Sequence, residues 1–239
     1  LVYKPVRFGS IYVAHGTSSN PSGETQGQAG NADPSGNFGN GRENLDPERN
    51  RSYEIGTKWD LLNERLSVTG AIFRTEKTNA RATDPTTGLV DLIGETVVDG
   101  VEIGISGKLT DRWEIVGGYT YLDAELVDDG AGSNDGNQVK YIAPHSFSLW
   151  TTYALTDDFK IGGGAYYMSE RFVDDANTRE LPSYWRFDAM AAYQVTDNIN
   201  LQLNVNNIFD ETYYDASHVG LFALVAPGRT GLLKADIKF

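Results

Sequence analysis

Alternation of apolar and polar residues with a period of two limits the fold of this chain more than any other feature. From Ile199 to Val205 every second side chain is aliphatic, and each residue between them is Asn or Gln. Successive side chains of a β-strand point to opposite faces, so this segment would be aliphatic on one face and amide-rich on the other. The sequence therefore predicts strands that separate two different environments.

The same period recurs along most of the chain, and apolar residues with helical spacing are convincing nowhere. Counting each alternating run as one strand gives about ten strands, with ends uncertain by a few residues. Leu1 to Lys4 would be the end of an earlier strand. The predicted strands are 10–18, 51–62, 65–79, 94–109, 113–126, 145–155, 159–173, 183–195, 199–209 and 225–239.

The connections between these strands fall into a short and a long group. The short group reads LLNERLS, LTDRWEI, LTDDFKI and VTDNINL, and three of the four contain Thr-Asp, where an Asp side chain can bond the nearby backbone. The long group is polar and covers about 20–50, 80–93, 127–143, 174–182 and 211–223. Short and long connections alternate, so each group is expected at one end of an antiparallel sheet.

Long strands, short turns at one end and long loops at the other are the plan of a transmembrane β-barrel. A tilted membrane strand needs about 9–11 residues, and a closed barrel pairs every backbone group within lipid. Aromatic residues gather near the strand ends, as interfacial girdles require. They are Trp59, Trp113, Tyr119, Tyr121, Tyr153, Phe159, Tyr167, Trp185 and Tyr193. We predict an all-β, antiparallel transmembrane β-barrel with short periplasmic turns and long extracellular loops.

A soluble β-sandwich or lipocalin-like barrel is the alternative, because alternation alone does not say which face meets the core. Composition excludes other classes. The net charge of −13 disfavours nucleic acid as a partner, since phosphate binding draws on Lys and Arg. The absence of Cys removes disulfide frameworks and thiolate chemistry, and no apolar run approaches the roughly 20 residues of a spanning helix.

Two segments near the C-terminus carry a family resemblance. NVNNIFDETYY, Asn204 to Tyr214, resembles the penultimate-strand motif of TonB-dependent outer-membrane receptors, and APGRTGLLKADIKF, Ala226 to Phe239, resembles their closing strand. VYKPVRFGSIYVAHGTSSNPSGE and LDPERNRSYEIGTKWDLLNERLSVTGAIFRTEKTNA resemble mid-barrel segments of the same family, in its catecholate-type ferric-siderophore branch. The resemblance covers nearly the whole chain.

The resemblance implies a 22-stranded barrel with an N-terminal plug, which imports ferric siderophores with energy passed through TonB. Residues 1–239 would be the C-terminal part of such a barrel, without the plug domain and the TonB box. The implied function is siderophore uptake by the intact protein in the outer membrane of a Gram-negative bacterium, with this chain supplying barrel wall and ligand-facing loops. A small passive pore or structural barrel without TonB coupling is the alternative, since ten strands could close by themselves.

The resemblance also implies partners: a ferric siderophore, TonB through the N-terminal region, the barrel-assembly machinery, and outer-membrane lipid with lipopolysaccharide. The assembly machinery would read the alternating final strand with its terminal aromatic residue. The residues of that signal are Leu233, Ala235, Ile237 and Phe239.

No catalytic or metal-binding motif stands out, so we expect no enzyme, no cofactor and no protein-bound metal. His15, His145 and His218 lack neighbouring carboxylates with ligand spacing, and no nucleophile elbow is present. The acidic stretch Asp128 to Asn137 has oxygen ligands for Ca²⁺ but lacks EF-hand spacing and the closing Glu. We interpret it as a solvated loop, with Ca²⁺ as the alternative.

A ferric catecholate would be anionic and aromatic, which favours Arg for charge and aromatic rings for stacking. Such residues at the loop-side ends of the predicted strands are the candidate ligand contacts, with girdle, salt-bridge or capping roles as the alternative for each. They are Arg81, Tyr141, Tyr166, Arg171, Tyr184, Arg186 and Arg229.

Overall fold

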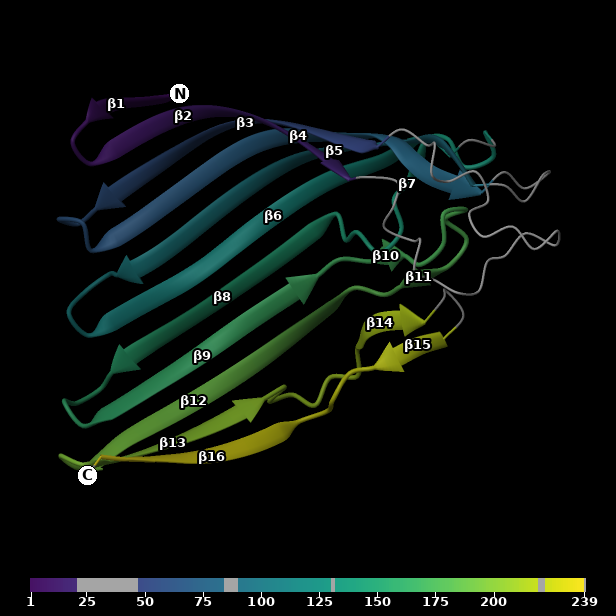
Figure 1. Ribbon diagram of the computed structural model, residues 1–239. Helices are drawn as coiled ribbons and strands as arrows, with labels where there is room; N and C mark the ends of the chain where they lie inside the picture. Colours follow the sequence, from purple (N-terminus) through teal and green to yellow (C-terminus); the bar gives the residue numbers. More distant parts are fainter. Residues whose placement is uncertain (21–46, 84–89, 130–131, 219–221, 239) are drawn as a thin grey trace.

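The fold is an all-β antiparallel sheet, seen in a computed structural model (Figure 1). The structure describes residues 1–20, 47–83, 90–129, 132–218 and 222–238. The described residues contain no helix that is both long and apolar enough to cross a bilayer.

The main sheet follows chain order from β1 to β16, with each strand antiparallel to the next in the sheet. Its order is β1-β2-β3-β4-β5-β6-β8-β9-β12-β13-β16, so β1 and β16 stand at the two ends of the described sheet. The strands are β1 (Val2–Val6), β2 (Gly9–Asn20), β3 (Glu48–Leu61), β4 (Leu66–Thr83), β5 (Val90–Lys108), β6 (Trp113–Asp128), β8 (His145–Ala154), β9 (Phe159–Met168), β12 (Tyr184–Thr196), β13 (Ile199–Asn206) and β16 (Thr230–Ile237). Ten predicted strands and the short Leu1 to Lys4 segment are thereby confirmed as elements of one sheet.

Five short strands lie at the loop end of the sheet, on the right of Figure 1. β7 (Asn137–Gln138) pairs with β6, β10 (Arg171–Phe172) pairs with β11 (Glu180–Leu181), and β14 (Tyr214–His218) pairs with β15 (Phe222–Val225). They fall largely in segments for which the sequence predicted only polar loops, so that prediction was incomplete. The prediction for 80–93 was wrong at both ends, because β4 continues to Thr83 and β5 begins at Val90.

Three predicted strand ends were wrong for identifiable reasons. The strand predicted to reach Phe209 stops at Asn206, because Asn207 has a positive φ of 54° and turns the chain. The strand predicted for 159–173 ends at Met168, and β10 follows it as a separate strand. The strand predicted for 225–239 begins at Thr230, since Val225 belongs to β15 and the Pro-Gly-Arg segment lies between them.

The short turns explain why the Thr-Asp dipeptide recurs. The hydroxyl oxygens of Thr110, Thr156 and Thr196 accept the backbone N–H of Arg112, Phe159 and Asn198 at 3.3, 3.0 and 3.3 Å. Threonine therefore provides the side-chain bond to the turn backbone in all three cases, where the sequence interpretation had assigned that role to Asp.

The register of the sheet places the alternating residues in rows on two faces. Across β8, β9, β12 and β13, one row joins Tyr153, Ile161, Ala191 and Leu203, while the row beside it on the other face joins Thr152, Gly162, Met190 and Asn204. We call the first the aliphatic face and the second the polar face. The opening segment, Ile199 to Val205, follows this division.

The aliphatic face is the exposed one. Ile55, Ile72 and Ile103 are 52–56 % exposed and Leu203 is 46 % exposed. Leaving such a side chain in water forfeits roughly 1.5–3 kcal/mol, so a whole face of them requires an apolar medium. Within the described part of the chain the buried hydrophobic residues are few, and most lie toward the loop end. This arrangement is the reverse of a soluble barrel, whose aliphatic residues fill the inside.

Aromatic rows bound the aliphatic face. Phe159 lies 6.4 Å from Tyr193 near the turns, and Tyr167 lies 4.8 Å from Trp185 toward the loops. The two rows are eight residues apart on each strand. Eight residues at about 3.3 Å each, tilted by about 40°, span roughly 20 Å, close to the apolar band of a membrane barrel. Near the loop end, on β4 and β5, the same face becomes ionic, where Arg74 pairs with Asp99 at 3.4 Å.

Candidate functional site

Arg186 of β12 is the centre of a polar and aromatic cluster on the polar face, toward the loop end. Its guanidinium carbon lies 4.4 Å from the ring centroid of Tyr166, which is its direct partner on β9. Nη2 donates to the carboxylate of Asp188 at 3.1 Å, and Nη1 donates to the hydroxyl of Tyr213 at 3.4 Å. We call Tyr166, Tyr184, Arg186, Asp188 and Tyr213 the Arg186 cluster.

Asp188 joins this cluster to the chain turn after β13. Its side chain is 7 % exposed, and its second oxygen accepts the backbone N–H of Asn207 at 2.8 Å. Asn207 is 2 % exposed, and its side-chain amide bonds both the N–H and the carbonyl of Glu211 at 2.9 Å. A buried carboxylate with two donors from separate segments fixes Arg186 relative to the last loop. The NNIFDE motif is thus explained as the turn that binds Asp188.

Tyr213 brings that loop onto the cluster. It is 6 % exposed and stacks on Tyr184 with ring centroids 4.4 Å apart. The backbone N–H of Ala226, which is equally buried, donates to the Tyr213 carbonyl at 2.9 Å. Tyr213 and Asp188 were absent from the sequence-derived candidates. Only the cluster geometry identifies Tyr213, since 27 residues separate it from Arg186.

The side chain of Arg171, in β10, connects two loop segments. It is 5 % exposed, and Nη2 donates to the carbonyl oxygens of Tyr214 and Asp215 at 3.2 and 2.9 Å. These bonds tie β10 to β14. The arginine thus provides a hydrogen-bond donor to carbonyl oxygens of a loop backbone that has few ladder partners of its own.

Two donors in this region have no hydrogen-bond partner among the residues that the structure describes. They are Nη1 of Arg171 and Nε of Arg186, and both atoms are buried. An unpaired buried N–H of a cation carries a cost that an acceptor would remove. The region therefore combines arginine side chains with aromatic faces, which suits an anionic, aromatic ligand.

The Pro-Gly-Arg segment closes the base of the same loop. The Asp210 carboxylate accepts the backbone N–H of Arg229 at 2.7 Å, and the Arg229 guanidinium donates to the Ile208 carbonyl at 3.3 Å. A Cβ at Gly228 would stand 2.9 Å from an Asp210 oxygen, so glycine permits this close approach. The two C-terminal segments that resemble the receptor family, Asn204 to Tyr214 and Ala226 to Phe239, are thus hydrogen-bonded to each other.

The remaining candidates lie outside the Arg186 cluster. Tyr141 is 43 % exposed in the connection after β7, with a φ of 65°, and its N–H donates to the Phe172 carbonyl at 2.7 Å. Arg81 pairs with Leu92 in the β4–β5 ladder, and its side chain is outside the described residues. Four of the seven candidates therefore come together around β10 and β12, namely Tyr166, Arg171, Tyr184 and Arg186.

The final strand shows the expected pattern at the proposed assembly signal. Leu233 and Ile237 are 69 % and 55 % exposed on the aliphatic face of β16, with Ala235 between them. Phe239 lies outside the described residues. The role of these residues in assembly stays a prediction.

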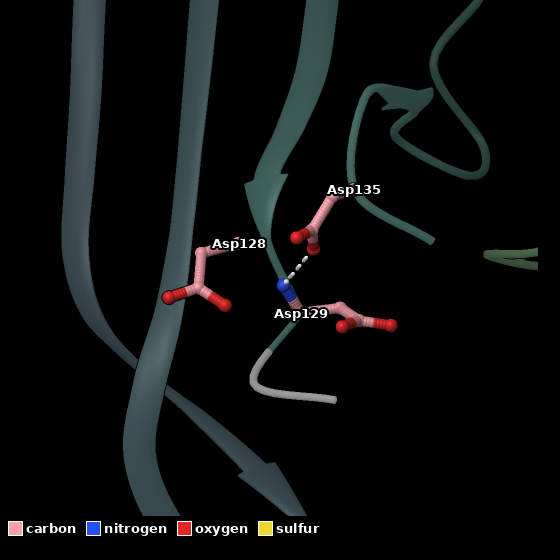
Figure 2. A group of neighbouring side chains, drawn as sticks. All are labelled: Asp128, Asp129 and Asp135. Carbon is pink, nitrogen blue, oxygen red and sulfur yellow. Dashed lines mark hydrogen bonds between the residues drawn. The ribbon is translucent and has the colours of Figure 1, made fainter. Parts of the chain in front are cut away.

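Three carboxylates, of Asp128, Asp129 and Asp135, have oxygen atoms within 4.8 Å of one another (Figure 2). Asp135 accepts the Asp129 N–H at 3.0 Å, and Asp129 accepts bonds from Ser133 and Asn134 at 2.8–3.0 Å. The carboxylates thus organise their own loop, as exposed Asp residues commonly do. These bonds support the solvated-loop interpretation, and the group of three carboxylates leaves Ca²⁺ as the alternative.

The histidines take part in ring contacts rather than in catalytic arrangements. His15 stacks on Tyr53 at 4.8 Å, and the Nδ1 atom of His145 lies 2.8 Å from the Tyr119 hydroxyl. Both pairs lie on the aliphatic face near its loop-end border, where aromatic girdle residues are expected. The side chain of His218 lies outside the described residues.

The face pattern and the loop cluster define the wall of an outer-membrane receptor barrel. A family model described as "TonB dependent receptor-like, beta-barrel" matches residues 1–208. The chain belongs to the TonB-dependent receptor family. Its sheet matches the C-terminal third of these barrels, its location is the outer membrane of a Gram-negative bacterium, and the family consists of transporters rather than enzymes.

Several curated relatives match the whole chain, and two of them are siderophore receptors from different genera. The probable TonB-dependent siderophore receptor PiuA of Acinetobacter baumannii is 41 % identical over 250 residues, and the chain covers 33 % of it. The catecholate siderophore receptor Fiu of Escherichia coli K12 is 33 % identical over 248 residues, and the chain covers 32 % of it. The chain therefore spans about a third of the length of the curated relatives it matches.

Solved structures agree with this placement. The crystal structure of PiuA from Acinetobacter baumannii superposes with a TM-score of 0.89 at 40 % identity, and the chain covers 35 % of it. The ferric-catecholate import receptor Fiu, in its closed form, superposes with a TM-score of 0.83 at 31 % identity, and the chain covers 34 % of it. In both cases all of this chain is matched, which supports the prediction of fold and family.

Proposed function

We propose that this chain is the C-terminal part of the barrel of a receptor that imports a ferric siderophore of catecholate type, energised through TonB. The plug domain and TonB box of that receptor would belong to other parts of the protein. The similarity to PiuA and Fiu over the full length of this chain supports the ligand class, since both are described as siderophore receptors.

The Arg186 cluster is the observation that carries this proposal. A ferric catecholate complex presents negative charge and aromatic rings at its surface. Arg186 would supply charge, and Tyr166 and Tyr184 would supply aromatic faces. Arg171 stays a candidate contact, and through its bonds to the Tyr214 and Asp215 carbonyls it would also hold β14 beside the cluster. Arg81, Tyr141 and Arg229 remain candidate contacts outside the Arg186 cluster.

The other partners are proposals that follow from membership of the family. TonB would act through the N-terminal region, and the barrel-assembly machinery would recognise Leu233, Ala235, Ile237 and Phe239. The aliphatic face would contact outer-membrane lipid, and lipopolysaccharide would meet the ionic border around Arg74 and Asp99.

Binding of a ferric catecholate to the receptor that contains this chain tests the proposal. The variant Arg186→Ala should weaken binding at least tenfold, about 1.4 kcal/mol, because it removes the cluster's central charge. Lys234→Ala is the matched control, since Lys234 is on the polar face of β16 near the turns and pairs only with Asp236 among the described residues, at 2.9 Å. Binding that is unaltered in Arg186→Ala would refute this site.

Uptake experiments separate the proposed receptor from a passive pore. Iron uptake from a ferric catecholate should disappear in cells without TonB and return when TonB is restored. Uptake that persists without TonB, together with steady ion conductance of the purified protein in planar bilayers, would favour the pore.

A further inference from the structure

The aliphatic face contains a hollow near the short-turn end, on β6, β8 and β9. Its volume is about 470 Å³, and its lining consists of Trp113, Thr151, Tyr153, Ile161, Gly162 and Gly163. These strands lie inside the sheet, with described neighbours on both sides. The lining of the hollow therefore comes wholly from this chain's own wall, and the hollow is open on the side that meets lipid.

The sheet register explains the shape of the hollow. Trp113, Tyr153 and Ile161 form one row of large side chains, and Thr151 and Gly163 are neighbours in the next row toward the loops. Gly163 contributes no side chain, which leaves the depression beside Ile161. Nothing in the backbone demands glycine here, because the nearest atom to a Cβ at this position, the Asp188 carbonyl oxygen, would lie 3.6 Å away.

The lining of the hollow has little polar character. The indole Nε1 of Trp113 donates to the Thr151 hydroxyl at 2.7 Å, and that hydroxyl donates to the Glu114 carbonyl at 2.9 Å. The main polar groups of the lining are thus bonded to one another. Tyr153 and Trp113 are each 42 % exposed, as expected for girdle residues at a membrane interface.

An ion pair stands at the turn end of these strands. Arg112 precedes Trp113, and its Nη1 donates to the Leu155 carbonyl at 3.4 Å, two residues beyond Tyr153. Its Nη2 lies 3.1 Å from the Asp157 carboxylate, and the two side chains are 52 % and 92 % exposed. A cation and an anion side by side in the interfacial region complement a zwitterionic lipid headgroup, whose phosphate would meet Arg112 and whose ammonium would meet Asp157.

We propose that this hollow binds one glycerophospholipid of the periplasmic leaflet. An acyl chain occupies the depression over Gly163 and Ile161, and the headgroup lies at the Arg112–Asp157 pair. Three features support this occupant: charge complementarity at the turns that adjoin the hollow, the apolar lining, and a position at the turn-end aromatic border of the lipid-facing surface. This site is separate from the Arg186 cluster, which lies on the opposite face toward the loops.

Native mass spectrometry of the intact receptor, delipidated in mild detergent and titrated with phosphatidylethanolamine, tests the site. The unaltered protein should retain one phospholipid at concentrations where detergent competes. Gly163→Leu fills the hollow and should lower that occupancy at least fivefold. Arg112→Gln removes the phosphate partner from an exposed turn and should lower it at least threefold.

Gly231→Leu is the matched control. Gly231 lies on the same face, on β16, and nothing lies within 4 Å of a Cβ placed there. This variant adds the same side chain to the lipid-facing surface away from the hollow, so its occupancy should equal that of the unaltered protein. Heat-modifiable gel migration confirms that each variant is folded, and Arg112→Gln gives the decisive result if Gly163→Leu fails to fold.

Equal occupancy in Arg112→Gln and the unaltered protein would overturn the proposal, as would equal occupancy in a folded Gly163→Leu. A loss of the same size in Gly231→Leu would also overturn it, because lipid would then bind the aliphatic face without a specific site. Retention of detergent alone, with no phospholipid in the unaltered protein, would mean that the hollow is ordinary lipid-facing surface.

Discussion

The strand wall and the loop end of this molecule follow opposite rules of burial. On the wall, Ile55, Ile72 and Ile103 are more than half exposed, and few apolar residues of the sheet are buried among those described. At the loop end, Asp188, Asn207 and Arg171 are almost fully buried and bonded to one another's segments or to loop carbonyls. A soluble protein would show the opposite in each region, with apolar side chains of the sheet buried and polar side chains of the loops exposed.

The difference indicates where the stabilising interactions of each region come from. Backbone ladders hold the wall, and the surrounding lipid accepts its side chains, so apolar residues there need only alternate. The loop end must order irregular backbone in water, and it does so with side-chain donors and acceptors to main-chain atoms. Changes on the wall should therefore act through lipid contact, whereas changes at the loop end should act through lost hydrogen bonds.

The largest expected effect comes from a charge on the lipid-facing side of the wall. Leu203→Arg should destabilise the inserted barrel by roughly 2 kcal/mol or more, because arginine costs about 2–4 kcal/mol at the bilayer midplane and Leu203 lies between the midplane and the turn-side aromatic row. Asn204→Arg, one residue along β13 on the polar face, should be milder. Urea unfolding of the protein in lipid vesicles gives both values. Equal losses would contradict the division into two faces.

Removing the buried carboxylate of the loop end should have the next largest effect. Asp188→Ala leaves Arg186 and the Asn207 N–H without their acceptor and should cost about 2 kcal/mol. Asp188→Asn keeps an acceptor for the Asn207 N–H and should cost less. The rate of hydrogen exchange at the Asn207 amide measures the local effect, and an Asp188→Ala rate like that of the unaltered protein would refute the role of Asp188.

Tyr213→Phe should have a smaller effect. The variant keeps the ring that stacks on Tyr184 and loses only the hydroxyl that accepts the Arg186 donor, so it should cost about 0.5–1.5 kcal/mol. Tyr213→Ala removes the stack as well and should cost more. Proteolysis of the 207–229 loop under native conditions measures both, and equal protection in the three proteins would show that Tyr213 does not hold the loop.

The smallest effect concerns pH and the β10–β11 loop. The Thr178 N–H at 2.9 Å, with further bonds from its hydroxyl and Arg179 nearby, holds the pKa of Asp174 below its ordinary value of 3.8. A lowered folded-state pKa stabilises the loop at pH above the ordinary value, and this contribution is lost as the pH falls through the folded-state pKa. Protection of the Thr178 amide should therefore be complete above pH 3.8 and decrease as the pH falls below it, and Asp174→Asn should remove that pH dependence.

The sequence predicted the wall well because its cause is local. The alternation on β3, β12 and β13 is a property of consecutive residues, and the lipid on one side acts on every strand in the same way. The alternation of short and long connections, together with the aromatic residues near the strand ends, then favoured a membrane barrel over a soluble one.

The loop end was predicted only in part, because its contacts join residues distant in sequence. Tyr166, Arg171, Tyr184 and Arg186 were selected by residue type and place, and the fold brings them together. Tyr213 was missed because it lies in a segment without alternation. Asp188 was read as one more polar residue of β12, although a carboxylate between Phe187 and Ala189 near an Asn-Asn turn could have suggested a buried acceptor.

The identity of the two faces is the central claim, and spin-label accessibility tests it most directly. The chain contains no Cys, so Ile103→Cys and Glu102→Cys give labels at neighbouring positions of β5 on opposite faces. In outer-membrane lipid, the label at 103 should be relaxed by dissolved oxygen and shielded from a water-soluble nickel complex, while the label at 102 should show the reverse. Equal accessibility at the two positions, or a reversed pattern, would contradict the account.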